Sequence, residues 1–279
     1  MSAGVVVASP LAAAFARAKA KGSRALVCYL VAGDPDLDAS LRLHERLICA
    51  GADVVELGLP FSDPIADGPV LQAAALRALQ GGMTVARALE LASRMRGAVP
   101  MVAMGYYNPI LAFGLDRFAE QAAAAGLVGA IIPDLPHEEA QSLRSALEKN
   151  ALDWIPLVAP TTSPERLVAV TAGARGFVYY VSVTGVTGAR TALPPQLAER
   201  LAQVRKISPA PVAVGFGVST PAQAAALAPL ADGVVVGSAL VQRFHALGAG
   251  AEALDECETF VRELKAALSI SPRSIFPDR

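Results

Sequence analysis

Short, continuously apolar runs rich in β-branched residues recur along the chain, and helix-like segments separate them. Runs that are apolar throughout, instead of alternating with polar residues, indicate strands covered on both faces, as in a parallel sheet flanked by helices. The Ala- and Leu-rich segments between them place apolar residues at three-and-four spacing, which predicts helices. The eight runs cover residues 25–31, 53–57, 100–104, 128–132, 154–158, 177–181, 211–214 and 233–236.

Eight strand–helix units within one chain of 279 residues predict a (β/α)8 TIM barrel. A doubly wound open sheet is the structural alternative, and periodicity does not separate the two architectures. The interval between the second and third runs has room for two helices, near 69–79 and 84–95, so we expect extra helices beside the basic units. Helices are also predicted at 11–19, before the first strand, and at 251–268, after the last.

Composition favours a single packed domain. Hydrophobic residues make up 53% of the chain and charged residues 18%, which excludes a disordered or collagen-like protein. No low-complexity linker or shift in composition divides the sequence, so we expect one barrel domain spanning residues 1–279. Its ends, about 1–10 and 270–279, are expected to be loosely ordered.

The charge of the chain limits the kinds of partner it can bind, and its cysteine content indicates the cellular compartment. The 24 Lys and Arg residues nearly balance 25 Asp and Glu residues, so there is no basic surface for nucleic acid or an anionic membrane. Every long apolar stretch is interrupted, and no membrane-spanning segment is expected. The three cysteines, Cys28, Cys49 and Cys257, lack metal-binding spacing; we expect them to be buried in a protein of the reducing cytoplasm.

Two carboxylates lie around the end of the second predicted strand, and barrel enzymes carry their active sites at the C-terminal ends of strands. Glu56 lies within this strand, and Asp67 lies in the Pro- and Gly-rich loop that follows. An unpaired buried carboxylate is costly, so Glu56 is either an acid–base group with a raised pKa or a core residue bonded to backbone or Arg. Asp67 is either functional or forms a turn or helix cap before Gly68.

Glycine-rich loops follow the last predicted strands. Residues 214–221 and 234–241 each contain a strand that ends in glycine and leads into a helix, where backbone N–H groups and the helix dipole can bind phosphate. Their position after strands 7 and 8 matches the recurrent phosphate site of barrels. The sixth strand leads into a Gly- and Thr-rich loop that is either a lid or an ordinary solvent loop. Tyr179, near the end of that strand, is either a site residue or a core tyrosine.

The positions of the lysines and histidines restrict the possible chemistry further. None of the five lysines is placed to form a Schiff base with a substrate. The three histidines lie in or beside different helical segments, so no metal site is expected. The sequence therefore predicts carboxylate and tyrosine chemistry on a small phosphorylated substrate, without metal or imine.

Seven motifs occur together in this chain: VVELGLPFSDPIADGP, YLVAGDP, GYYNPI, PDLP, VTGVTGA, VGFGVS and VVVGSALV. Through them, residues from about 25 to 241 resemble the tryptophan synthase alpha subunit family. The first motif is highly specific because it places Glu56 and Asp67 eleven residues apart. The resemblance implies a (β/α)8 barrel and a carbon–carbon lyase of tryptophan biosynthesis, which cleaves indole-3-glycerol phosphate to indole and glyceraldehyde 3-phosphate by a retro-aldol reaction.

The resemblance also implies roles for individual residues. Glu56 matches the general acid–base residue, Asp67 matches the carboxylate that accepts the indole N–H bond, and Tyr179 matches a supporting tyrosine of the active site. Thr187 matches the threonine of the lid. The positions that match the phosphate site are Gly188, Gly217, Gly237 and Ser238, and those that match the indole pocket are Tyr29, Met104, Tyr106, Ile131 and Phe216.

Two residues depart from the family pattern, since Val31 stands where a threonine is expected and Tyr29 stands where some members carry phenylalanine. By the same resemblance, the chain needs no cofactor of its own and passes indole to a pyridoxal-phosphate beta subunit in an α2β2 complex. The apolar segment 109–113 is expected either to contact this partner or to pack under the barrel rim. The residues that match the docking side are Pro60, Asp63, Pro64, Asn108 and Pro136.

Three other functions stay open on the sequence. Another phosphate-binding barrel, such as a sugar-phosphate isomerase, would share the loops at Gly217 and Gly237 but would not need Glu56 and Asp67 as a pair. A free-standing indole-3-glycerol phosphate lyase would keep every catalytic residue and work without a partner. A non-catalytic module that only activates its partner is the third, and intact Glu56, Asp67 and Tyr179 argue against it.

Overall fold

The strands form one parallel sheet whose two ends are consecutive in the chain. The computed structural model describes residues 9–181, 196–215 and 217–270, and within them the strand order is β5-β4-β3-β2-β1-β9-β8-β7-β6. Because β5 and β6 come from the same predicted run, this run joins both edges and closes a (β/α)8 barrel, which excludes the open sheet. The strands are β1 Ala25–Val31, β2 Val54–Gly58, β3 Met101–Met104, β4 Leu127–Ile131, β5 Asp153–Trp154, β6 Leu157–Val158, β7 Val178–Val181, β8 Val212–Gly215 and β9 Gly233–Val236.

The fifth predicted run differs from the expectation of one strand over 154–158, because it forms two short strands. Pro156 has no N–H group to donate to a neighbouring strand, so the ladder breaks there. The N–H of Ile155 donates to the carbonyl of Ala130 at 3.0 Å, and the carbonyl of Pro156 accepts from Tyr179 at 2.9 Å. The first half of the run, β5, thus pairs with β4, and the second half, β6, pairs with β7.

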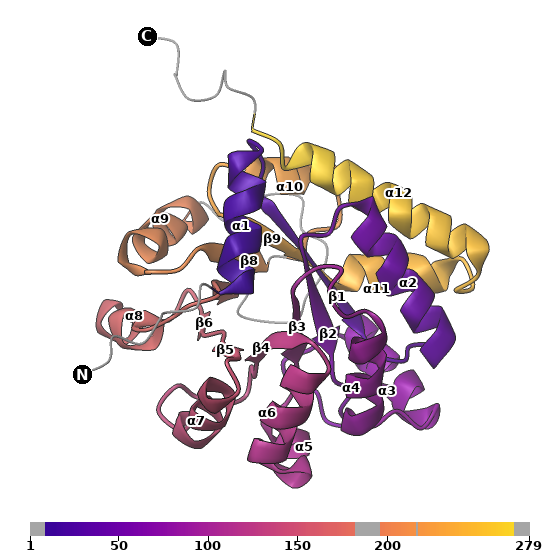
Figure 1. The fold of residues 1–279 in the computed structure, drawn as a ribbon. Coiled ribbons are helices and arrows are strands. Elements are labelled where there is room, and N and C mark those ends of the chain that lie inside the picture. The colour runs from indigo at the N-terminus through magenta and orange to yellow at the C-terminus, as the bar shows by residue number, and fades with distance from the viewer. Residues whose placement is uncertain (1–8, 182–195, 216, 271–279) are drawn as a thin grey trace.

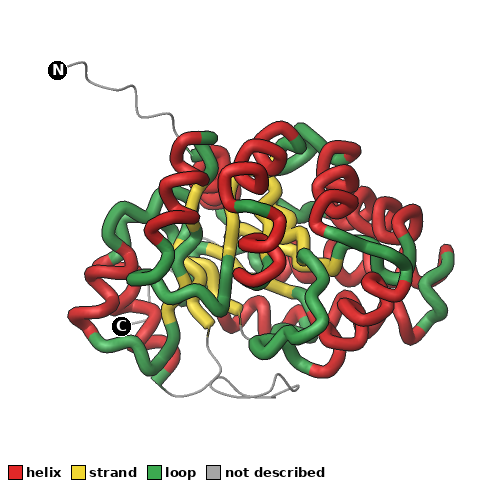
Figure 2. The backbone as a smooth tube through the Cα atoms, turned by 90° about the horizontal axis from the view of Figure 1, so that it is seen from below, coloured by secondary structure: helices red, strands yellow, loops and turns green. Residues whose placement is uncertain are grey.

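Helices surround the strands (Figure 1), and in a view at right angles the strands lie between helices on either side (Figure 2). The prediction of two helices between the second and third strands is confirmed by α3 and α4, and the predicted first and last helices correspond to α1 and α12. The helices are α1 Pro10–Ala20, α2 Leu37–Ala50, α3 Pro69–Gln80, α4 Val85–Arg94, α5 Tyr107–Phe113, α6 Leu115–Ala124, α7 Gln141–Lys149, α8 Pro164–Thr171, α9 Leu197–Ile207, α10 Pro221–Leu227, α11 Ser238–Ala246 and α12 Ala251–Ala267.

Helix α1 packs against the apolar interior of the barrel, and Figure 1 shows it crossing in front of β8 and β9. Its Leu11 and Phe15 are buried in a cluster with the inward-facing residues of the strands. Phe15 stacks on Phe177, with ring centroids 5.3 Å apart, and Phe177 lies 6.4 Å from the ring of Tyr179. The interior is therefore filled from the N-terminal ends of the strands up to the layer of Tyr179.

Two of the three cysteines are buried, and both ends of the chain lie outside the described residues. Cys28 and Cys257 are buried as expected, but Cys49 is exposed, so that prediction is wrong for one of the three cysteines. Cys49 lies on α2 next to positions that face the core, and a helix turns successive residues to different sides. Residues 1–8 and 271–279 lie outside the described part of the chain, while Pro10 already begins α1.

The burial of His44 on α2 is expected to lower the free energy of unfolding at acidic pH. Its ring is 0% exposed; Nδ1 lies 2.6 Å from the carbonyl of Ser40, and Nε2 has no hydrogen-bond partner in the described part of the chain. Burial lowers the pKa of His44 to about 4 because it disfavours the charged ring. An unfolded histidine has a pKa of about 6.5, so the unfolded chain binds a proton that the folded chain excludes between these values.

The free energy of unfolding should therefore fall as the pH falls from about 6.5 to about 4, by about 3 kcal/mol from this group. We expect His44→Leu to remove that contribution, because leucine does not titrate. Urea unfolding of both proteins at pH 7, 6, 5 and 4 measures the difference. Parallel stability curves for the two proteins would contradict the prediction.

Candidate active site

A cavity of about 490 Å³ opens at the C-terminal ends of the strands. It takes residues from β1, β2, β3, β6, β7, β8 and β9 and from the loops that follow them, so it lies where the fold class places an active site. The residues that line it are Tyr29, Glu56, Ile65, Ala66, Asp67, Gly68, Leu71, Met104, Pro133, Leu157, Tyr179, Val181, Gly215, Gly217, Val235, Gly237 and Ser238.

Glu56 lies in the middle of β2, between Tyr29 on β1 and Val102 on β3 in the sheet register. Its side chain is 0% exposed, and neither carboxyl oxygen has a hydrogen-bond partner among the described residues. The alternative of a core glutamate bonded to backbone or Arg is therefore not what the structure shows. Burial raises the pKa of Glu56 to about 8, so the group holds a proton at neutral pH.

Asp67 lies in the loop between β2 and α3, and its backbone N–H donates to the carbonyl of Pro64 at 3.0 Å. It does not cap the helix, because Gly68 is the N-cap and no side chain bonds the first turn. Burial raises the pKa of Asp67 to about 6, and a hydrogen bond from the Tyr106 hydroxyl acts in the opposite direction. The carboxyl group is consequently ionised in most molecules at neutral pH.

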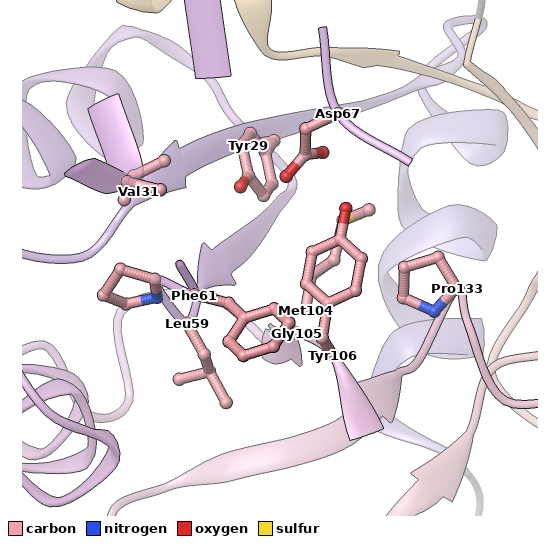
Figure 3. A pocket seen from close by; sticks show the side chains of 11 residues that line it. Tyr29, Val31, Leu59, Phe61, Asp67, Met104, Gly105, Tyr106 and Pro133 are labelled. Atoms are coloured by element: carbon pink, nitrogen blue, oxygen red, sulfur yellow. The ribbon is translucent and has the colours of Figure 1, made fainter. Parts of the chain in front are cut away.

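Tyr106 connects this loop to the barrel. Its hydroxyl accepts a hydrogen bond from the N–H of Ala66 at 3.0 Å, and its ring lies 5.5 Å from that of Phe61. Figure 3 shows the hydroxyl directed toward Asp67, with Tyr29 beside the same carboxylate. Tyr106 thus holds the residue before Asp67 and faces Asp67 itself. It lines a small side pocket next to the main cavity.

Two tyrosines line the cavity, Tyr29, which is buried, and Tyr179, which is partly buried. A Cβ atom on Gly58 would lie 2.5 Å from the Tyr29 hydroxyl, and one on Gly215 would lie 2.6 Å from the Tyr179 hydroxyl. Both glycines are therefore needed for the rings to lie where they do. Burial raises the pKa of both tyrosines well above the ordinary value, so both hydroxyls keep their protons and can donate.

Glycines and the start of α11 line the cavity on the side of β8 and β9. Helix α11 begins at Ser238, and its N-cap Gly237 supplies no side-chain hydrogen bond to the first turn. Gly217 adopts a left-handed backbone (φ +64°), which favours glycine. The described lining of the cavity contains no Lys or Arg, and the groups in it that suit an anion are backbone N–H groups and the N-terminal end of the α11 dipole.

Comparison with known proteins agrees with this geometry. The sequence model of the family described as tryptophan synthase alpha chain matches residues 15–269. The chain is 49% identical over 262 residues to the tryptophan synthase alpha chain of Geobacter sulfurreducens, covering 93% of this chain and 99% of that one. The chain belongs to the tryptophan synthase alpha chain family. A cyanobacterial member, from Picosynechococcus sp., is 47% identical, with 91% and 97% of the two chains covered.

Solved structures show the same fold. A structure of Mycobacterium tuberculosis tryptophan synthase superimposes with a TM-score of 0.87 at 42% identity, covering 95% of this chain and 100% of that one. The tryptophan synthase alpha chain of Legionella pneumophila gives a TM-score of 0.85 at 36% identity, covering 94% and 98%. The chain is thus a carbon–carbon lyase of tryptophan biosynthesis that cleaves indole-3-glycerol phosphate to indole and glyceraldehyde 3-phosphate.

The cavity brings together most of the residues that the resemblance to this family singled out, namely Glu56, Asp67, Tyr179, Gly217, Gly237, Ser238, Tyr29 and Met104. Tyr106 lines the side pocket, as do both departures from the family pattern, Tyr29 and Val31. Ile131 is buried in the interior cluster and does not line the cavity. Thr187, Gly188 and Phe216 lie outside the described residues.

The expected docking residues lie on loops that follow strands, except Asn108, which lies in the first turn of α5. Asp63, Asn108 and Pro136 are exposed, whereas Pro60 and Pro64 are buried. In the apolar segment 109–113, part of α5, Ile110 is buried but Leu111 is 50% exposed, so the segment both packs under the rim and presents apolar surface. In the loop between β2 and α3, Ile65 is 83% exposed.

Sequence analysis missed several lining residues. Leu157, Val181 and Val235 lie at strand ends and are indistinguishable in type from core residues, and Leu71 lies on the first turn of α3. Gly215 ends β8 and was a usable signal, because a glycine at a strand end often marks close approach of another group. In the described part of the chain, no cluster of three or more His, Cys, Asp or Glu could hold a metal ion, and no helix is long and apolar enough to cross a membrane.

We expect the substitution Gly237→Val to weaken binding of the substrate phosphate. A Cβ atom at this position would lie 2.9 Å from Cδ1 of Tyr29, so the larger side chain must displace the ring or the start of α11. We expect KM for indole-3-glycerol phosphate to rise by about tenfold or more, because a binding contact is lost. Gly250→Val is the control, since a Cβ there meets no atom within 4 Å. An unchanged KM for Gly237→Val would refute the phosphate assignment.

Proposed function

We propose that Glu56 and Asp67 together carry out the retro-aldol cleavage of indole-3-glycerol phosphate in this cavity. The supporting observation is that one cavity combines a fully buried carboxyl group that has no partner among the described residues, a partly buried carboxylate, and a glycine-rich helix start that suits an anion. Two carboxyl groups with separated pKa values can act as acid and as stabilising anion at the same pH. Met104, Pro133 and Leu71 supply apolar wall for the indole ring.

Glu56 is proposed as the acid and then the base. Its carboxyl group gives a proton to C3 of the indole ring, which becomes an indolenium cation. The resulting carboxylate accepts the proton of the hydroxyl next to the scissile bond as that carbon becomes an aldehyde. The electron pair of the broken carbon–carbon bond returns to the ring, which leaves indole and glyceraldehyde 3-phosphate, and Glu56 regains its proton.

Asp67 is proposed as the acceptor of the indole N–H bond. Positive charge develops on that nitrogen when C3 is protonated, and a fixed carboxylate stabilises it most in the transition state. The pKa of about 6 keeps Asp67 ionised at neutral pH. Tyr179 is assigned a supporting role as a protonated donor that lines the cavity, and Gly217, Gly237 and Ser238 are assigned to the phosphate. Gly188 and Thr187 keep their expected roles as phosphate and lid residues.

We further infer that indole passes to a beta subunit that carries pyridoxal phosphate, in an α2β2 complex, and that this chain holds no cofactor itself. The relatives are alpha chains, and a similar solved structure is named as tryptophan synthase. Exposed apolar Ile65 and Leu111 lie beside the exposed docking candidates Asp63 and Asn108, and such a surface suits a protein partner. A cytoplasmic location is proposed because the three cysteines are free.

The partner is expected to raise turnover. The loop that carries Asp67 also carries Asp63 and Pro64, so docking can reposition the catalytic carboxylate. We expect a matched beta subunit to increase indole release by about tenfold or more, a change of about 1.4 kcal/mol in the barrier. Indole release is measured for the purified chain alone and with beta subunit at equal concentration. Strong activity that the partner leaves unchanged would contradict this expectation and favour a free-standing lyase.

A further inference from the structure

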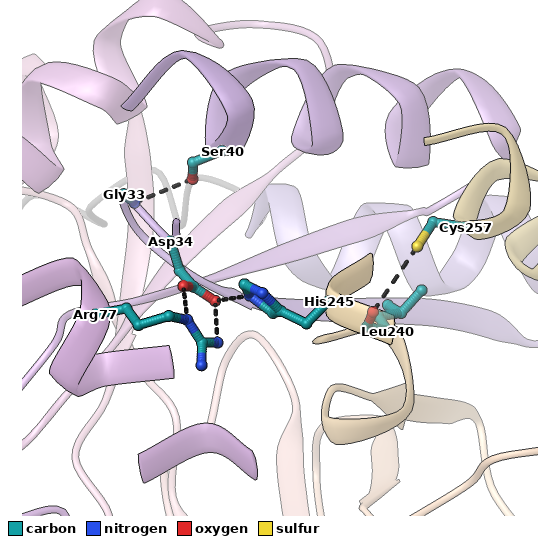
Figure 4. A network of polar contacts seen from close by, with 7 residues as sticks. All are labelled: Gly33, Asp34, Ser40, Arg77, Leu240, His245 and Cys257. Carbon is teal, nitrogen blue, oxygen red and sulfur yellow. Dashed lines mark hydrogen bonds and ion pairs between the residues drawn. The ribbon is translucent and has the colours of Figure 1, made fainter. Parts of the chain in front are cut away.

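Asp34 lies in the loop after β1 and accepts hydrogen bonds from two helices that are far apart in the chain. Arg77 of α3 donates from Nε to Oδ1 at 2.8 Å and from Nη2 to Oδ2 at 3.0 Å. His245 of α11 donates from Nε2 to Oδ2 at 2.8 Å. The Asp34 side chain is only 5% exposed. Figure 4 shows the carboxylate lying between the guanidinium and the imidazole.

The loop that carries Asp34 is itself held in place. Gly33 adopts a left-handed backbone (φ +77°), and its N–H donates to the hydroxyl of Ser40 on α2 at 3.0 Å. The N–H of Asp34 is 3.4 Å from the carbonyl of Val31, the last residue of β1. A buried carboxylate that satisfies two partners from a fixed loop is a firm anchor, because removing a partner leaves charge without compensation.

Both helices run between this anchor and the cavity. Helix α3 begins directly after Asp67 and Gly68, and Arg77 lies in its last turn. Helix α11 begins at Ser238 of the proposed phosphate site, and His245 lies in its last turn. The two helices also contact each other and β1. Helix α3 has 12 residues and is about 18 Å long, and α11 has 9 residues and is about 14 Å long.

The start of α3 is bonded to Asp67, so a displacement of the helix reaches the carboxylate. The amide of Gln72 donates to the carbonyl of Asp67 at 2.9 Å, and the N–H groups of Leu71 and Gln72 both donate to Gly68 at 3.0 Å. On the other helix, the N–H of Leu240 donates to Gly237 at 2.9 Å. Each helix is thus fixed to Asp34 at its far end and to one half of the site at its near end.

We infer that Asp34 is a positioning residue that aligns the two halves of the active site, with Arg77 controlling the placement of Asp67 and His245 controlling the placement of the phosphate site. This inference rests on the proposed function of those two halves. The two connections have different kinetic consequences. Misplacing Asp67 weakens stabilisation of the transition state, whereas misplacing the start of α11 weakens binding of the phosphate in substrate and transition state alike.

The test compares kcat and KM for indole-3-glycerol phosphate in Arg77→Met and His245→Phe. Arg77→Met should lower kcat by about tenfold or more with KM nearly unchanged, because a small misplacement of a catalytic group is costly. His245→Phe should raise KM by about fivefold or more with kcat nearly unchanged. Arg77→Lys restores a cation opposite Asp34 and should recover much of the kcat that Arg77→Met loses.

Arg243→Met is the matched control, because Arg243 also lies on α11 but pairs with Glu256 and lies over the ring of Phe260. It should change neither kinetic constant appreciably. Urea unfolding of every variant shows whether it is folded under the assay conditions. The inference would be overturned if Arg77→Met and His245→Phe left both constants unchanged. It would also be overturned if both variants changed kcat and KM together in the same way. A wild-type chain that releases no indole would instead overturn the proposed function.

Discussion

Glu56→Gln should lower kcat by about 10²- to 10⁴-fold, because the amide has no acidic proton for indole C3 and cannot accept the hydroxyl proton afterwards. Glutamine has nearly the shape of the protonated glutamate, so substrate binding should be retained. Indole release is measured in a single turnover with the enzyme in saturating excess over substrate, and binding is measured separately by calorimetry. Loss of binding together with activity would point to a collapsed cavity instead of lost acid–base chemistry.

The pH dependence gives a second readout for the same group. Since Glu56 must hold its proton to act as the acid, kcat/KM of the wild type should fall as the pH rises through about 8. The residual activity of Glu56→Gln should lack this decline. Glu258→Gln serves as the control, because Glu258 pairs with Arg46 and Arg262 on the outside of the barrel. A Glu56→Gln rate close to that of the wild type would remove Glu56 from the mechanism.

Asp67→Asn should lower kcat by about 10²- to 10³-fold, because the neutral amide no longer stabilises positive charge on the indole nitrogen. Wild-type activity should also fall as the pH drops through about 6, where Asp67 becomes protonated. The protonation of Asp67 at low pH and the deprotonation of Glu56 at high pH together predict a bell-shaped pH profile of kcat/KM, with its maximum between about pH 6 and about pH 8. The variant should keep only the alkaline limb.

Asp63→Asn is the matched control for this loop. Asp63 lies four residues earlier, is exposed and bonds the neighbouring Ser62 hydroxyl. It belongs to the proposed docking surface, so the comparison is made without beta subunit. If Asp63→Asn and Asp67→Asn lose the same activity, the loop needs its overall charge and not a specific carboxylate at the cavity.

The sequence alone predicted the strand–helix order because that information is local. Continuous apolar runs and three-and-four spacing depend only on neighbouring residues, and they place Glu56 on a strand, Asp67 in the following loop and glycines after β8 and β9. The rule that barrel sites lie at the C-terminal ends of strands then predicts that these residues meet. The cavity of the folded chain contains them together.

The single strand predicted over 154–158 shows where local reading fails. Its composition is that of one strand, but Pro156 interrupts the ladder at the place where the run passes from β4 to β7. Which neighbour a residue bonds is decided by the closed sheet and not by its own segment. The exposure of Cys49 is a similar case, since helix orientation against the barrel decides it.

The composition and order of residues determined the succession of strands and helices and placed Glu56 and Asp67 at the end of a strand. Only the tertiary structure showed that the sheet closes into a barrel. It also decided the chemical state of these two carboxyl groups. Glu56 has a raised pKa because residues from distant strands exclude water from it and offer it no partner. Arg77 and His245 meet at Asp34 for the same reason: desolvation and hydrogen bonding depend on what packs together in space, and residues far apart in the sequence supply both.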